Sequence, residues 1–406
     1  MKIYTNKIPN YIINVLTTFL FFIFISLNTA SWGKYAMLAI SFVICAISAS
    51  SYCGGVKFTV KPFHIFLFVF AVYCGISSFW AIGPKDSLTD CKIIFSILGC
   101  FSLIYMHYQK EDNTSTLINI LKYGGLLMAI YTIFYYGFNN IIAGIQGDRI
   151  GTTFANTNNV GMVAAFTCLL QFYDILCKKN IILNILFFII TLIVLLATQS
   201  RTAIICLILG IILLSYLKST DKKNFLKALK NFVLFSLVFI FLLYIIPKFY
   251  SEYGFIERIN GLFSAINGDN RNADHSAQVR LQLINIGWEA FKKHPILGVG
   301  MKNGHYIAQE KINFKGFFHN NYIEILCGGG IIGLFIYYSI YVYLFYMLIK
   351  YRANNYDVFF ICITCLVIML LMDYGSVTYY TKQQYFYLMI ISLLIDQLKT
   401  IKSGTR

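Results

Sequence analysis

The segment FFHNNYIEILCGGGIIGLF, residues 317–335, joins a polar cluster to an apolar run. His319, Asn320, Asn321 and Glu324 supply the polar side chains, and the residues after them are typical of a helix that crosses the ~30 Å of membrane hydrocarbon. Solvation alone gives no reason to place a histidine and a carboxylate at the start of such a helix. The segment therefore predicts a membrane span with a functional site at its beginning.

The composition of the whole chain agrees with a membrane protein. Of the 406 residues, 58% are hydrophobic and only 12% are charged, against roughly 25% charged residues in an ordinary soluble domain. The net charge of +16 lies mostly in short loops between apolar runs, so it does not indicate nucleic-acid binding. The eleven cysteines lie mostly inside apolar runs, so we expect small core residues and no metal site or cofactor.

About twelve apolar runs are long enough to cross a membrane, and we expect them to form one all-α polytopic bundle over residues 1–406. The first run has no clear cleavage site after it and is taken as a retained helix. The runs lie near residues 11–28, 35–52, 63–80, 90–107, 116–137, 157–176, 181–198, 202–217, 231–247, 327–349, 357–373 and 383–397.

The distribution of lysine and arginine predicts the orientation of the bundle. With the N-terminus inside, the inner segments hold about 17 basic residues and the short outer loops about 5. Both termini are therefore expected in the cytoplasm, and the one long loop, residues 248–326, is expected outside. Within this loop, residues 280–293 (RLQLINIGWEAFKK) have Leu281, Ile284, Trp288 and Phe291 at helical spacing, and Pro295 follows. We expect an amphipathic helix that lies on the membrane surface or caps a cavity.

Three arginines on the expected outer face break the apolar pattern. Arg149 lies in GDRIGTTFANTNNVG (147–161), Arg201 lies in TQSRTA (198–203), and Arg280 opens the loop helix. An arginine near the hydrocarbon is costly unless it faces a wet cavity or a partner. Each has a simpler alternative: Arg201 could extend to the headgroups, Arg149 could pair with Asp148, and Arg280 could anchor its helix to lipid phosphate.

Taken together, these residues suggest a chemistry. Each guanidinium group can bind two phosphate oxygens at once and stays charged. Two or three arginines, in a sequence without a DxD motif, would therefore bind a diphosphate without metal. A histidine such as His319 can accept the proton of an attacking hydroxyl, although it could also be a histidine packed on Phe317 and Phe318. A sugar carried on a lipid diphosphate would suit this site, because no nucleotide sugar is supplied outside the cell.

In this order, the motifs DRIGTTFANTNNVG (148–161), TQSRTA (198–203), VRLQLINIGWEAFKKHPILGVGMKNG (279–304) and FHNNYIEILCGGGIIGLF (318–335) resemble the bacterial O-antigen ligase and polymerase superfamily. The resemblance implies a GT-C-like membrane glycosyltransferase that is metal-independent and inverting. It implies diphosphate binding by Arg201 and Arg280 and acceptor activation by His319. Arg149, Asn320, Asn321 and Glu324 are added from the residues themselves, with Glu324 as an orienting partner of the histidine.

The implied donor is an undecaprenyl-diphosphate-linked glycan in the plasma membrane. The implied acceptor is a second lipid-linked repeat unit for a polymerase, or the lipid A core for a ligase, and a chain-length regulator is an optional further partner. HNNYIE with the GVG turn looks slightly more like a polymerase, but nothing in the sequence excludes a ligase. A polysaccharide or lipid transporter would predict two repeat halves with broken helices, which the sequence does not show. A structural scaffold would leave Arg201 unexplained.

Overall fold

The computed structural model describes residues 7–26, 33–51, 59–109, 113–146, 150, 156–219 and 275–403. Every regular element among them is a helix, as the sequence predicts. Three expectations lie outside the described residues: the position of Arg149, the apolar run at 231–247 and the first part of the long loop, residues 248–274.

Seven of the described helices are long and apolar enough to cross a membrane. They are α1 (Lys7–Ser26), α3 (Pro62–Ile76, continued by the short 3-10 helix η1, Ser77–Phe79), α4 (Pro84–Tyr108), α5 (Thr114–Tyr136), α7 (Thr157–Leu176), α9 (Arg201–Lys218) and α14 (Asn321–Tyr351, followed by η2, Arg352–Asn354). Three shorter apolar helices accompany them: α2 (Gly33–Ser51), α8 (Ile181–Ala197) and α15 (Tyr356–Met372). The described part of the chain is therefore all-helical, with several helices able to span a membrane as in a multi-pass membrane protein, while the number of about twelve spans stays a prediction.

The remaining helices are more polar or too short to span. They are α6 (Phe138–Gln146), α12 (His275–Lys293), α13 (Gly304–Ile312) and α16 (Lys382–Ser403). Although α16 is more polar, its middle is buried, and its aromatic side chains meet those of other helices. Phe386 stacks on Phe21 of α1 with ring centroids 4.8 Å apart, and Tyr387 lies 4.4 Å from Phe166 of α7. Buried aromatic rings thus join α16 to the centre of the bundle.

Asparagine begins several of these helices. Asn113, Asn156 and Asn355 each accept a hydrogen bond from a backbone N–H in the first turn of α5, α7 and α15. Proline occupies the first position of α3 and α4, where no N–H is needed. These residues satisfy or remove donors that a helix start would otherwise leave unpaired.

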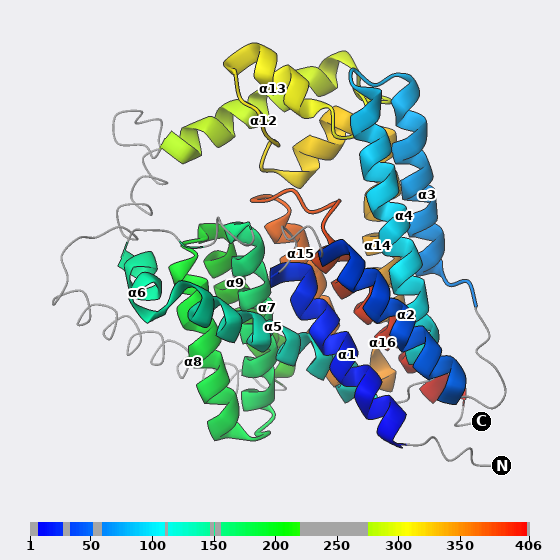
Figure 1. Ribbon diagram of the computed structural model, residues 1–406, viewed down its shortest axis with the longest axis vertical. Helices are drawn as coiled ribbons and strands as arrows, with labels where there is room; N and C mark the ends of the chain where they lie inside the picture. Colours follow the sequence, from blue (N-terminus) through cyan, green and yellow to red (C-terminus); the bar gives the residue numbers. More distant parts are fainter. Residues whose placement is uncertain are drawn as a thin grey trace.

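The bundle has two opposite ends, which different elements occupy (Figure 1). At one end, basic residues pair with acids: Lys61 with Asp396 at 3.3 Å, and Lys218 with Asp357. The beginning of α1 and the end of α16 lie at this end. At the opposite end, α12 and α13 lie across the bundle, together with the α3–α4 connection and the start of α14. Ion pairs occur at this end too, where Lys302 lies near Asp90 and Lys311 pairs with Glu289, so the side of the membrane that each end faces stays a prediction.

The helix α14 changes direction at Gly330. This residue has φ 59° and ψ −162°, which no right-handed helix contains. A Cβ atom at Gly330 would lie 2.3 Å from the carbonyl oxygen of Ile296, so only glycine fits there. The expected span 327–349 is therefore corrected: the helix begins earlier, at Asn321, and its first segment, residues 321–329, turns away from the rest.

The first segment of α14 packs under α12, the helix predicted at residues 280–293. The structure confirms a helix here, which begins earlier, at His275, and ends at Lys293 before Pro295. Its buried side chains Leu283, Ile286 and Ala290 belong to one apolar cluster with Phe318 and Ile323. This cluster fixes α12 and α13 to the start of α14 and so positions the residues discussed next.

Candidate active site

His319 precedes α14 and has an unusual backbone conformation. Its φ of 55° lies in the left-handed region, which costs a residue with a Cβ atom of the order of 1–2 kcal/mol. Its half-buried side chain lies near the Phe314 ring, with ring centroids 6.1 Å apart. Residues held in this region cluster at functional sites, where the surrounding structure maintains the strain.

Two neighbouring side chains fix the backbone around His319. Upstream, the backbone N–H of Phe318 donates to the Glu324 carboxylate at 2.9 Å. Downstream, the Asn320 side-chain oxygen accepts from the backbone N–H of Ile323 at 3.1 Å and so caps α14. Both Glu324 and Asn320 are buried. Glu324 thus contacts the backbone beside the histidine, while its role as an orienting partner of the imidazole stays a proposal.

Asn321 connects the start of α14 to the connection between α15 and α16, residues 373–381. Its side-chain oxygen accepts from the backbone N–H groups of Thr378 at 2.9 Å and Tyr379 at 3.0 Å. Its side-chain nitrogen donates to the Tyr338 hydroxyl at 3.0 Å and to the Asp373 carboxylate at 3.3 Å. Asn321 is fully buried, so its role is to hold the start of α14 against residues 373–381.

Arg201 is the first residue of α9, and its side chain is half buried. The adjacent residue, Thr202, packs so closely on the α15–α16 connection that a Cβ at Gly375 would lie 2.2 Å from its hydroxyl oxygen. On the other side, the Ser200 hydroxyl donates to the Asn158 side chain of α7 at 3.3 Å. The start of α9 therefore contacts the same connection that Asn321 binds.

Arg280 lies on α12, seven residues before Gly287. Two helical turns separate them, so they share a face of α12, about 10 Å apart along the axis. At Gly287, a Cβ would lie 2.3 Å from Ile323 and 3.1 Å from Phe318, which shows that this face lies on the start of α14. The half-buried Arg280 is therefore placed on the face of α12 that leads to the histidine segment.

The structure thus places Arg201, Arg280 and His319 at one end of the bundle, on elements that contact one another directly or through residues 373–381. Arg149 lies outside the described residues. Among the described residues, no three His, Cys, Asp or Glu side chains are grouped so as to hold a metal ion. Metal independence nevertheless remains an expectation from the sequence.

A buried polar cluster near this site was not predicted from the sequence. The Tyr379 hydroxyl donates to the Asp90 carboxylate of α4 at 2.6 Å, and the ammonium of Lys302 lies 3.8 Å from the other oxygen of Asp90. Asp90 is 1% exposed. A carboxylate within an apolar run is itself a signal of function or of a buried partner, and Asp90 stands at the edge of the expected run 90–107.

The electrostatics of the α15–α16 connection are set by burial. Burial raises the pKa of the Asp373 carboxyl to about 7, while hydrogen bonds from Thr378, Tyr338 and Asn321 act in the opposite direction. Burial also raises the pKa of the Tyr379 hydroxyl, and the nearby Asp90 adds to this effect. Within residues 373–381, the acid is thus held among donors in a site that disfavours its charge.

These features define a class: a multi-pass membrane protein with a polar site, rich in cationic and amide groups, at one end of its helices. The family described as O-antigen ligase matches residues 186–338, which run from α8 into α14 and include Arg201, Arg280 and His319. The match supports membership of the O-antigen ligase and polymerase superfamily, as the sequence motifs predict. It indicates a ligase-type function or that of a related polymerase. No curated protein matches this sequence.

Proposed function

We propose that the protein is a membrane glycosyltransferase that polymerises undecaprenyl-diphosphate-linked oligosaccharide repeat units on the outer face of the plasma membrane. The observation that carries the proposal is the shared contact at residues 373–381. The start of α9, which bears Arg201, packs on Gly375, and the start of α14, which His319 precedes, is bound to Thr378 and Tyr379. Residues 373–381 thus contact both the helix that begins with Arg201 and the helix that follows His319. This shared contact supports a common site for the proposed phosphate-binding arginine and the proposed base.

In the proposed reaction, Arg201 and Arg280 bind the diphosphate of the donor lipid. His319 accepts the proton of an acceptor hydroxyl as its oxygen attacks the anomeric carbon. The bond between this carbon and the diphosphate oxygen breaks, and the lipid diphosphate leaves with its charge neutralised by the two guanidinium groups. Attack opposite the leaving group inverts the anomeric configuration.

The ligase alternative uses the same donor and the same three residues, but transfers the glycan to the lipid A core. The description of the matching family favours it, whereas the HNNYIE segment with its GVG turn favours the polymerase. The outward orientation of the site rests on the distribution of lysine and arginine in the sequence, which favours the cytoplasm for the loops richest in basic residues.

The test replaces Arg201, Arg280 and His319 singly with alanine and follows surface polysaccharide on gels at matched protein level. Each variant should lose long-chain glycan. Lys315→Ala, an exposed cation outside the three positions, is the control and should leave the ladder intact. A lost polymerase leaves a single repeat on its acceptor, whereas a lost ligase leaves a bare core and accumulated lipid-linked chains. Full-length polysaccharide in all three variants would refute the enzyme proposal.

A further inference from the structure

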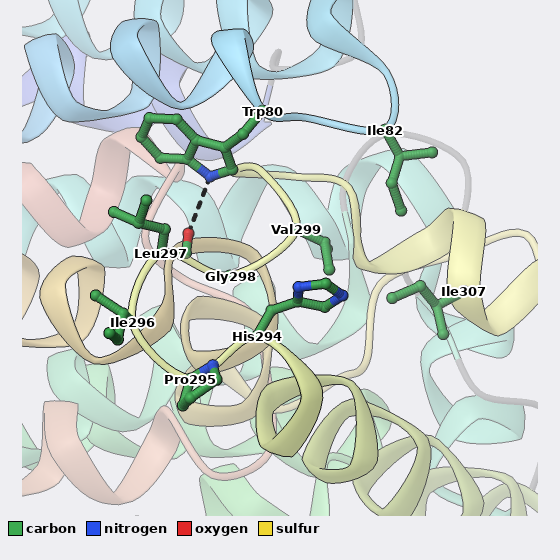
Figure 2. Close-up of a pocket in the computed structure, with 9 residues that line it drawn as sticks. All are labelled: Trp80, Ile82, His294, Pro295, Ile296, Leu297, Gly298, Val299 and Ile307. Atoms are coloured by element: carbon green, nitrogen blue, oxygen red, sulfur yellow. Dashed lines mark hydrogen bonds between the residues drawn. The ribbon is translucent and has the colours of Figure 1, made fainter.

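An apolar pocket of about 560 Å³ lies where the α3–α4 connection meets the α12–α13 connection (Figure 2). Its wall is held by backbone and indole hydrogen bonds. The Trp80 indole N–H donates to the Leu297 carbonyl at 3.1 Å, and the Ile82 N–H donates to the Val299 carbonyl at 3.2 Å. The lining consists of Trp80, Ile82, residues 294–299 and Ile307, and His294 is its one titratable member.

Two exposed apolar stripes on membrane-spanning helices lead to this pocket. The α3 stripe ends at Phe79, which is 88% exposed and adjoins Trp80. The α14 stripe begins at Ile332, whose N–H donates to the carbonyl of Ile296 in the pocket wall. The stripes consist of Ile65, Phe68, Val69, Ile76 and Phe79 on α3 with η1, and of Ile332, Phe335, Val342, Tyr346 and Ile349 on α14.

These stripes belong to helices that contact each other. The Tyr73 hydroxyl of α3 donates to the Gly329 carbonyl of α14, and a Cβ at Gly333 would lie 3.0 Å from the Tyr73 ring. Side chains at 3.6-residue spacing that face outward from membrane helices face lipid. A hydrocarbon chain that lies along either stripe therefore reaches the pocket without crossing a polar surface.

Basic side chains lie beside the pocket. Lys292 and Lys293 end α12 directly before the pocket residue His294, and all three are exposed. The dipole of a helix stabilises cations at its C-terminal end, so the positions of Lys292 and Lys293 are favourable even without a bound ligand. The nearby acid Glu289 is paired with Lys311, which leaves the end of α12 positively charged.

We propose that this pocket is a binding site for an anionic phospholipid, with one acyl chain in the apolar cavity and the phosphate on Lys292 and Lys293. Lys293 lies thirteen positions after Arg280 along α12, which is about 20 Å of helix. One diphosphate cannot reach both positions, so the lipid bound here is a different molecule from the proposed glycan donor. The proposed occupant is a phospholipid, which carries no glycan and so is neither the donor nor a lipid-linked acceptor, and lipid binding tests the site independently of glycan synthesis.

Tryptophan fluorescence offers a direct test, because Trp80 lines the pocket and bromine on an acyl chain quenches a nearby indole. The full-length chain carrying Trp32→Phe and Trp288→Phe retains Trp80 alone. After reconstitution in phosphatidylcholine vesicles, brominated phosphatidylglycerol should quench Trp80 at a lower mole fraction than brominated phosphatidylcholine does. A lysine near a membrane surface favours an anionic lipid by about fivefold, so two lysines predict a preference of at least that size.

Lys292→Glu with Lys293→Glu should abolish the preference for phosphatidylglycerol while quenching by brominated phosphatidylcholine remains, which shows that the pocket is still formed. The control, Lys85→Glu with Lys315→Glu, makes the same charge change at other exposed lysines and should keep the preference. Equal quenching by both lipids in the Trp80 protein, or equal loss of preference in both double variants, would overturn the proposal. Failure of brominated phosphatidylcholine to quench Trp80 would also overturn it, because no acyl chain would enter the pocket.

Discussion

Asn321 and Asp373 are bound to each other twice. The backbone N–H of Asn321 donates to the Asp373 carbonyl at 2.7 Å, and the Asn321 side-chain nitrogen donates to the Asp373 carboxylate at 3.3 Å. The Asp373 carboxylate also accepts from the hydroxyls of Thr378 and Tyr338. The start of α14 and residues 373–381 therefore form one hydrogen-bonded unit, and His319 lies two residues before its centre.

Asn321→Ala should destabilise the protein far more than Asn320→Ala. The first change leaves the backbone N–H groups of Thr378 and Tyr379 buried without their acceptor, at a cost of at least about 3 kcal/mol. The second removes one helix cap, at a cost of about 1 kcal/mol. Thermal unfolding in detergent measures both. Equal midpoints for the two variants would contradict the view that Asn321 holds residues 373–381.

Asp373 should make the folded protein less stable as pH rises. Its folded pKa of about 7 exceeds the unfolded value of about 3.9, so the folded state binds the proton more tightly. Stability contributed by this proton is full below about pH 4 and is lost as pH rises toward 7. Asp373→Asn, which has no proton to lose, should show a smaller fall in unfolding midpoint between pH 5 and pH 8.

The matched control for this experiment is Asp357→Asn. Asp357 is exposed and pairs with Lys218 at the opposite end of the bundle. This variant should keep the fall in midpoint that the wild-type protein shows. If Asp357→Asn and Asp373→Asn change the pH dependence equally, burial of Asp373 is not its source.

The long apolar helices were predictable because membrane insertion imposes a long apolar run on each, and α12 because its apolar side chains recur at helical spacing, whereas the short helices α6 and α13 were not predicted. The structural roles of Asn320 and Asn321 could not be predicted from the sequence. The sequence marks them as site residues, whereas Asn320 caps α14 and Asn321 binds a segment more than fifty residues away. A local pattern contains no sign of such a distant partner.

Two further features depend on geometry that an apolar pattern does not encode. The bend in α14 depends on the positive φ of Gly330 and on the approach of Ile296, and three adjacent glycines look alike in the sequence. The pairing of Asp90 with Tyr379 and Lys302 joins three separate segments. Only the carboxylate within an apolar run could have drawn attention to it.

Glu324→Ala should reduce glycan synthesis more than Glu324→Gln. The glutamine oxygen can still accept from the Phe318 N–H and so hold the backbone before His319, whereas alanine leaves this N–H without its acceptor. We expect polymer yield near the wild-type level for glutamine and a loss of tenfold or more for alanine, of the order expected when a reacting group is misplaced. Equal activity of both variants at matched protein level would show that this bond does not position the site.

Gly330→Ala should destabilise the first segment of α14, residues 321–329. The new Cβ would collide with the Ile296 carbonyl in a backbone region open only to glycine, so we expect a cost of more than about 2 kcal/mol. Gly99→Ala in α4 is the matched control, because a Cβ there meets no atom within 4 Å and alanine favours a helix by about 1 kcal/mol. A lower unfolding midpoint for Gly330→Ala and an unchanged or higher one for Gly99→Ala are expected. Equal midpoints would show that the bend is not required.

His319→Gly separates a catalytic role from a structural one. Glycine adopts a φ of 55° without strain, which offsets the entropy it loses on folding, so the free energy of unfolding should stay within about 1 kcal/mol of the wild-type value. Loss of the base should nevertheless reduce transfer by about 100-fold or more. Asn313→Gly is the control: Asn313 is an exposed residue with φ 53°, so this variant relieves the same strain and should keep full polymer synthesis. If His319→Gly is stable and makes full-length glycan, the imidazole takes no part in the reaction; if it unfolds while Asn313→Gly does not, the histidine serves the fold.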